Sequence, residues 1–125
     1  MARRIAVIDD DEAIRDLLAE VLADEGYEPL VFADGEAALP ALGRHPPDAL
    51  ILVRRLPPPL DGWALLGCLR ADPALRALPV LVCTGDERAI QEQTAVLDRL
   101  GCAALAKPFA LDDLLATLVR LGVAP

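Results

Sequence analysis

Near the start of the chain, a cluster of acidic side chains follows a short apolar run. Residues 5–8 are apolar, as in a strand buried on both faces, and they lead directly into Asp9, Asp10, Asp11 and Glu12. Carboxylates this close raise each other's pKa, so their grouping is costly unless a metal ion, a basic side chain or water offsets it. One of them, Asp10 or Asp11, is expected to cap the helix that begins at Ala13. The others have the oxygen chemistry of a cation site.

The elements that would position these acids follow from the hydrophobic pattern. It predicts strands at residues 5–8, 30–32, 49–53, 80–83 and 103–106. It predicts helices from Ala13 to Gly26, over 36–42 with Gly43 as its end, from Gly62 past Leu69, over about 87–99, and over 111–118. The first helix is expected to carry Arg15, with Asp16, Glu20 and Asp24, on its outer face.

Alternating strands and helices predict a parallel sheet with helices on both faces. Ligands of such sheets bind beyond the carboxyl ends of the strands, so the residues there are the candidate site residues. These strand-end residues are Asp9, Asp10, Val53, Thr84 and Lys107.

Length and composition limit the class of protein. The 125 residues fit one domain spanning 1–125. A net charge of -8 and a pI near 4.5 argue against direct binding to nucleic acid or an anionic membrane. Without a signal peptide or an apolar run of about 20 residues, we expect a cytoplasmic protein. Cys68, Cys83 and Cys102 are interpreted as reduced core residues.

Several short motifs occur together in one order. They are the Ile-Asp-Asp-Asp run at 8–11, Asp34-Gly35, Pro47-Asp48, Leu56-Pro57, Asp61-Gly62, Thr84 and Lys107-Pro108-Phe109. With five strand-helix units, the chain resembles the receiver domain of two-component response regulators over nearly its whole length. The resemblance implies a flavodoxin-like, doubly wound α/β fold with five helices and strand order 2-1-3-4-5. It also implies phosphoryl transfer from a histidine kinase to an aspartate at the end of the third strand, with an acid pair for Mg²⁺ and a Thr and a Lys beside the phosphoryl group.

The chain departs from the family at the phosphoacceptor. Counting back four residues from Pro57 gives Val53, and counting from Gly62 gives Arg54. Neither side chain can accept a phosphoryl group as an aspartate does. The aromatic residue that the family usually places three before the lysine is here Ala104. These losses together predict an atypical pseudo-receiver.

Two other aspartates are poor substitutes for the missing acceptor. Asp48 begins the same strand about 16 Å away, at ~3.3 Å per residue, and so lies at the wrong end of the sheet. Asp61 is interpreted as the cap of the next helix.

The remaining site residues each have two interpretations. Asp9 and Asp10 either bind Mg²⁺ weakly or cap the helix and pair with Lys107, the only lysine in the chain. We expect a buried or half-buried ion pair for Lys107. The Thr84 hydroxyl is expected to bond to nearby backbone. One guanidinium of Arg54 or Arg55 either lies over the acids, replacing the charge of the metal, or points into solvent.

The favoured function is a signalling module of the two-component phosphorelay that works without phosphorylation and is not an enzyme. No tightly bound cofactor is expected. Its partners would be proteins, such as a histidine kinase or an output protein, and the sequence leaves homodimerisation open.

The first alternative is an active receiver that uses an unusual acceptor such as Asp10 or Asp11. The second is a flavodoxin-like enzyme that binds a nucleotide or flavin. It is disfavoured because the acids after the first strand would repel a phosphate and no glycine-rich loop stands there to bind one.

Overall fold

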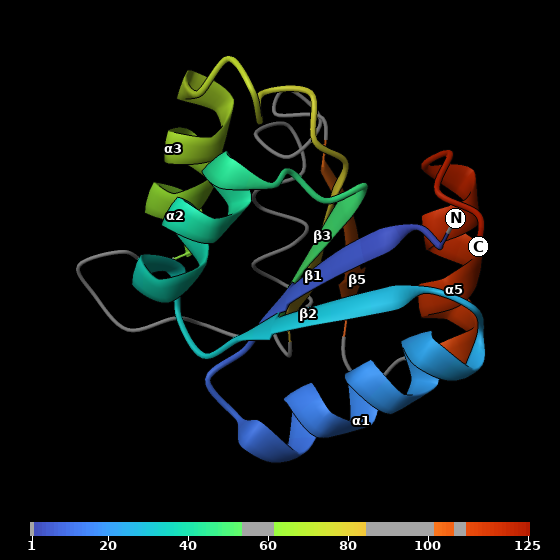
Figure 1. Ribbon diagram of the computed structural model, residues 1–125. Coiled ribbons are helices and arrows are strands. Elements are labelled where there is room, and N and C mark those ends of the chain that lie inside the picture. Colours follow the sequence, from blue (N-terminus) through green and yellow to red (C-terminus); the bar gives the residue numbers. More distant parts are fainter. Residues whose placement is uncertain (1, 54–61, 85–101, 107–109) are drawn as a thin grey trace.

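The computed structural model describes residues 2–53, 62–84, 102–106 and 110–125 (Figure 1). Its strands are β1 (Arg4–Ile8), β2 (Glu28–Phe32), β3 (Ala49–Val53), β4 (Val80–Thr84) and β5 (Cys102–Ala106). Its helices are α1 (Glu12–Asp24), α2 (Gly35–Arg44), α3 (Gly62–Ala71) and α5 (Leu111–Arg120). The helix predicted at about 87–99 lies outside the described residues. None of the described helices is long and apolar enough to cross a membrane.

The five strands form one parallel sheet in the order β2-β1-β3-β4-β5. This order confirms the doubly wound, flavodoxin-like α/β fold that the sequence predicts. Because β1 and β3 are the central strands, their apolar side chains are covered on both faces, which explains why each is a continuous apolar run.

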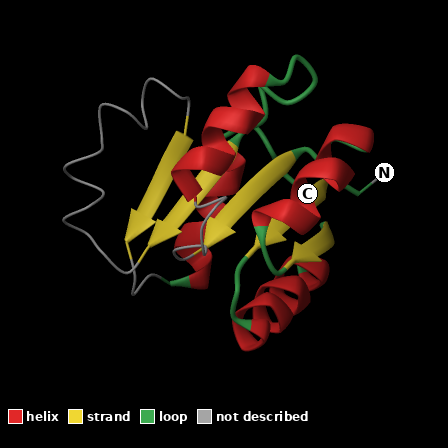
Figure 2. Ribbon diagram, turned by 90° about the vertical axis from the view of Figure 1, so that its left-hand side faces the viewer, coloured by secondary structure: helices red, strands yellow, loops and turns green. Residues whose placement is uncertain are grey.

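Two helical layers cover the sheet, with α2 and α3 on one face and α1 and α5 on the other (Figures 1 and 2). Successive residues of β1 alternate between them: Ala6 and Ile8 pack with α2 and α3, whereas Ile5 and Val7 pack with α1 and α5. The two apolar clusters bury β1 between the helical layers. The acidic residues directly follow this buried strand.

Some element boundaries differ from the predicted ones. β2 begins at Glu28, two residues before the predicted start at Leu30, because it pairs with β1 along its full length. Pro29 is tolerated there since β2 is an edge strand. The predicted end of α2 at Gly43 is wrong, because the helix continues to Arg44. The predicted end of α1 at Gly26 is confirmed by the left-handed φ of 95°.

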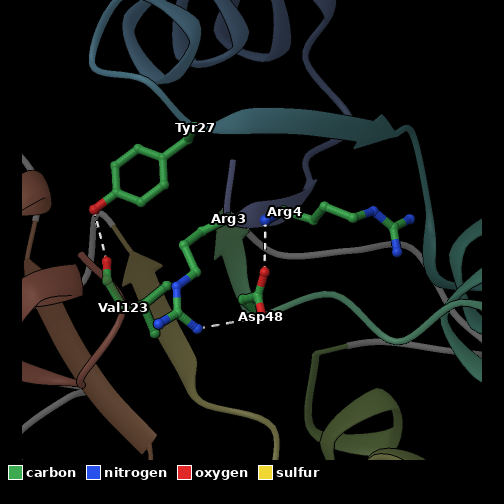
Figure 3. A network of polar contacts seen from close by, with 5 residues as sticks. All are labelled: Arg3, Arg4, Tyr27, Asp48 and Val123. Carbon is green, nitrogen blue, oxygen red and sulfur yellow. Dashed lines mark hydrogen bonds and ion pairs between the residues drawn. The ribbon is translucent and has the colours of Figure 1, made fainter. Parts of the chain in front are cut away.

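The amino-terminal edge of the sheet is fastened by a network of polar contacts (Figure 3). The Arg4 amide donates to Asp48 Oδ2 at 2.7 Å, and Arg3 Nη1 lies 3.7 Å from Asp48 Oδ1. The buried Tyr27 hydroxyl donates to the Val123 carbonyl at 2.7 Å and ties the segment after α5 to the start of β2. Burial, and secondly the charge of Glu25, raises the pKa of Tyr27, so this hydroxyl keeps its proton.

The three cysteines are free thiols, but they do not share one environment. Cys83 and Cys102 are buried, as predicted. The prediction for Cys68 is wrong, because it is exposed on α3. Burial raises the pKa of Cys102, and the Arg70 guanidinium, 3.9 Å from its sulfur, partly opposes this.

Candidate functional site

The carboxyl-terminal edge of the sheet brings the predicted strand-end positions together. Ile8 pairs with Leu52, so Asp9 follows β1 at the level where Val53 ends β3. Val53 in turn pairs with Cys83, immediately before Thr84. The backbone positions of Asp9, Val53 and Thr84 therefore lie on consecutive strands at one edge, as the topology requires.

Asp9 is a fully buried carboxylate at this edge, with 0 % of its surface exposed. Its amide donates to the Phe32 carbonyl at 3.1 Å and so continues the pairing of β1 with β2 by one residue. Its Oδ1 accepts a hydrogen bond from the Asp11 amide at 3.0 Å. Asp9 thus fixes the turn that leads from the strand into α1.

The acids after Asp9 differ in role. Asp11 is the N-cap of α1: its Oδ1 accepts a hydrogen bond from the Ala13 amide at 2.9 Å. This settles the choice between Asp10 and Asp11, and the helix begins at Glu12, one residue earlier than predicted. The interpretation that Asp9 and Asp10 cap the helix is wrong. Asp10 is exposed, so its carboxylate is accessible from solvent.

Arg15 also lies at this site, although the sequence pattern predicts it elsewhere. It was predicted to lie on the outer face of α1, but it is half-buried, and its Nη1 donates to the Asp9 carbonyl oxygen at 2.8 Å. A signal was present in the sequence: Arg15 is the fourth residue of the helix, where the positive end of the helix dipole disfavours a cation. A nearby acceptor offsets the cost of a cation at this position.

The other predicted site residues are only partly described. The backbones of Val53, Thr84 and Ala104 lie in β3, β4 and β5. Lys107, Arg54 and Arg55 lie outside the described residues, as does Asp61. The ion pair predicted for Lys107, the placement of an arginine over the acids, and the hydroxyl contact of Thr84 therefore stay predictions.

The oxygen ligands available at this edge decide whether the site fits Mg²⁺, the ion that the resemblance to receiver domains implies. Mg²⁺ requires near-octahedral oxygen coordination from carboxylates, water and phosphate. Here Asp9 is already engaged with the Asp11 amide, Asp10 is exposed, and valine supplies no oxygen at the end of β3. Within the described ranges, no three His, Cys, Asp or Glu side chains are grouped so that they could hold a metal ion. These residues do not fit a tight Mg²⁺ site.

Comparison with known proteins gives a consistent match. The family model for the response regulator receiver domain matches residues 5–119. The response regulator MprA of Mycobacterium tuberculosis is 39% identical over 121 residues, which are 97% of this chain and 51% of that protein. The chain thus spans about half the length of this relative.

Solved structures are similar as well. The chemotaxis response regulator CheY4 of Vibrio cholerae superposes with a TM-score of 0.84 at 27% identity, covering 97% of this chain and 99% of that one. NtrX from Brucella abortus, solved in complex with ATP, gives a TM-score of 0.83 at 35% identity, covering 97% of this chain and 27% of that one.

Proposed function

The chain belongs to the response regulator receiver domain family, and we propose that it is a receiver whose signalling does not depend on phosphorylation of its third strand. The observation that carries the proposal is the residue at the end of β3. Val53 is the last residue of that strand and lies level with Asp9 on β1. An isopropyl side chain has no oxygen with which to attack a phosphoryl group.

The other differences at this edge support the same proposal. Valine ends β3, and no three His, Cys, Asp or Glu side chains are grouped for a metal ion among the described residues. In an active receiver, Mg²⁺ would neutralise charge during phosphoryl transfer. Position 104 carries alanine, whose side chain has no rotamers with which to switch. We expect at most weak Mg²⁺ binding at Asp9 and Asp10.

Such a module would act through protein partners in the cytoplasm. A histidine kinase or an output protein fits the family, and its activity would depend on binding or on concentration. We propose no direct contact of this domain with nucleic acid or membrane, since its net charge is -8. No catalytic role is proposed.

One observation favours the alternative of an active receiver with an unusual acceptor. Asp10 is exposed, so a phosphodonor can reach its carboxylate. Asp11 is a weaker candidate because its Oδ1 is engaged in capping α1.

Intact-mass measurement after incubation with acetyl phosphate and Mg²⁺ tests the proposal. The protein should gain no stable phosphoryl group. The Val53→Asp variant, which restores a carboxylate at the end of β3, is the matched control and should gain one.

A stable phosphoryl group on the unmodified protein would contradict the proposal. Asp10→Asn and Asp11→Asn variants would then identify the acceptor, since loss of the added mass in one of them assigns the site.

A further inference from the structure

Residues 121–125 follow α5 and form a short segment that we call the strap. The Gly122 amide donates to the Val119 carbonyl at 2.9 Å, and the Val123 amide donates to the Leu118 carbonyl at 2.9 Å. These two hydrogen bonds make a Schellman motif, in which Gly122 has a left-handed φ of 87°. The motif ends the helix and turns the chain, so that the strap lies against the fold.

The other side of the strap is held by the turn between α1 and β2. Val123 is 3% exposed and belongs to the same apolar cluster as Tyr27. The Tyr27 hydroxyl donates to the Val123 carbonyl at 2.7 Å (Figure 3). A Cβ placed on Gly26 would lie 3.5 Å from Pro125 Cβ, so the end of the strap lies directly beside this turn. The strap therefore joins the ends of α5 and α1, two helices of the same layer.

The strap is attached more lightly than the strands of the sheet. Val123 is buried, whereas its other residues are exposed or half-buried. By contrast, residues 5–8 of β1 are all fully buried, and this strand pairs with a neighbour on each side. The free energy of opening a segment grows with the apolar contacts and protected hydrogen bonds that the opening breaks. The strap should therefore open at a lower cost than the sheet.

We infer that the strap is a clasp that opens and closes as one unit while the sheet and its carboxyl-terminal edge stay folded. The closed clasp joins α5 to the turn between α1 and β2 through Val123 and Tyr27. Its opening breaks their hydrogen bond, exposes the Val123 side chain, and releases the Schellman motif at the end of α5. The inference goes beyond the proposed function and is independent of it, since the strap contacts the amino-terminal edge and Asp9 lies at the opposite edge.

Amide hydrogen exchange of the full chain, followed residue by residue by NMR, tests the inference. In the parent protein, the amides of Leu121, Gly122 and Val123 should share one protection factor, at least about tenfold lower than those of β1. Tyr27→Phe removes the hydroxyl that holds the strap. It should lower the three protection factors about thirtyfold, the factor that corresponds to about 2 kcal/mol.

A second variant strains the strap without touching Tyr27. Gly122→Ala adds a Cβ at a left-handed φ, and that Cβ would meet no atom within 4 Å, so the strain is confined to the backbone. It should lower the same three protection factors about fivefold, and it decides the test if Tyr27→Phe fails to fold. Asp48→Ala is the control, because it removes an acceptor at the same edge but outside the strap. It should leave the three protection factors unchanged.

Three results would overturn the inference. Protection factors in the strap equal to those of β1, or lowered by Asp48→Ala, would mean that the strap opens only when the whole fold does. Three different protection factors within the strap would mean that it does not open as a unit. Protection factors unchanged in both Tyr27→Phe and Gly122→Ala would mean that neither contact holds the strap.

Discussion

At the amino-terminal edge of the sheet, the Asp48 carboxylate accepts a hydrogen bond from the Arg4 amide and lies beside the Arg3 guanidinium. At the carboxyl-terminal edge, the Asp9 carboxylate accepts a hydrogen bond from the Asp11 amide and is followed by three more acids. Both aspartates bond to backbone, but their surroundings differ in charge and in burial. Asp48 is part-exposed among cations, whereas Asp9 is fully buried at the start of an acidic run.

The difference indicates that the amino-terminal edge stabilises the fold, whereas the carboxyl-terminal edge corresponds to the phosphorylation site of the receiver family. The amino-terminal contacts join β1 to the residue before β3, and the residue before β2 to the segment after α5, and each brings complementary groups together. The carboxyl-terminal edge keeps like charges close together, an arrangement that costs stability and is typical of functional sites. The four acids at residues 9–12, called the acidic turn below, therefore remain in a chain that we propose has lost its phosphoacceptor aspartate.

The largest stability effect is expected at the amino-terminal edge, from Tyr27→Phe. The substitution removes the donor to the Val123 carbonyl and leaves that buried acceptor unsatisfied. We expect the free energy of unfolding to fall by about 2 kcal/mol. Urea unfolding monitored by circular dichroism measures this, and an unchanged midpoint would show that the contact contributes nothing.

The same hydroxyl gives a pH dependence. The pKa of Tyr27 is raised in the folded protein from its ordinary value of 10.0, chiefly by burial. Its contribution to stability is therefore constant below about pH 10 and falls as the pH rises through the folded-state value, because the unfolded chain ionises first. The stability difference between the parent and Tyr27→Phe should narrow above pH 10 and stay constant between pH 7 and 9.

A smaller effect is expected from Asp48. Asp48→Ala removes the acceptor of the Arg4 amide and should cost about 1 kcal/mol. Asp48→Asn keeps an oxygen acceptor and loses only the ion pair with Arg3, whose side chain is 52% exposed, so it should cost less than about 0.5 kcal/mol. Equal losses in both variants would assign the effect to the ion pair instead of the amide contact.

The sequence predicted the fold better than the details of either edge. The apolar runs of β1 and β3 and the strand-helix alternation determine a buried parallel sheet, and the observed order confirms it. The left-handed Gly26 was also predictable, because a glycine after an amphipathic pattern ends a helix.

The contacts that fasten the edges were not predictable in the same way. Tyr27 and Val123 are 96 residues apart, and no local pattern signals their hydrogen bond. Periodicity assigned Arg15 to the outer face of α1 because it ignores what lies beyond the helix end. The predictions for Lys107, Arg54 and Arg55 concern positions outside the described residues, whereas the contact of Arg15 with the Asp9 carbonyl oxygen lies within them.

The smallest changes in the free energy of unfolding are expected from replacing two helix N-caps at the carboxyl-terminal edge. Asp34 caps α2 through the Ala37 amide at 2.7 Å, and Asp11 caps α1 through the Ala13 amide at 2.9 Å. Asp34→Ala should cost about 1 kcal/mol. Asp11→Ala loses the same kind of bond but also removes one charge from the acidic turn, so its net cost should be about half as large. Since salt screens the repulsion, urea unfolding at low and high NaCl should show the two costs converging as salt rises. Equal costs at low salt would mean that the acids of this turn do not destabilise it. The two edges would then differ in sequence but not in electrostatic cost.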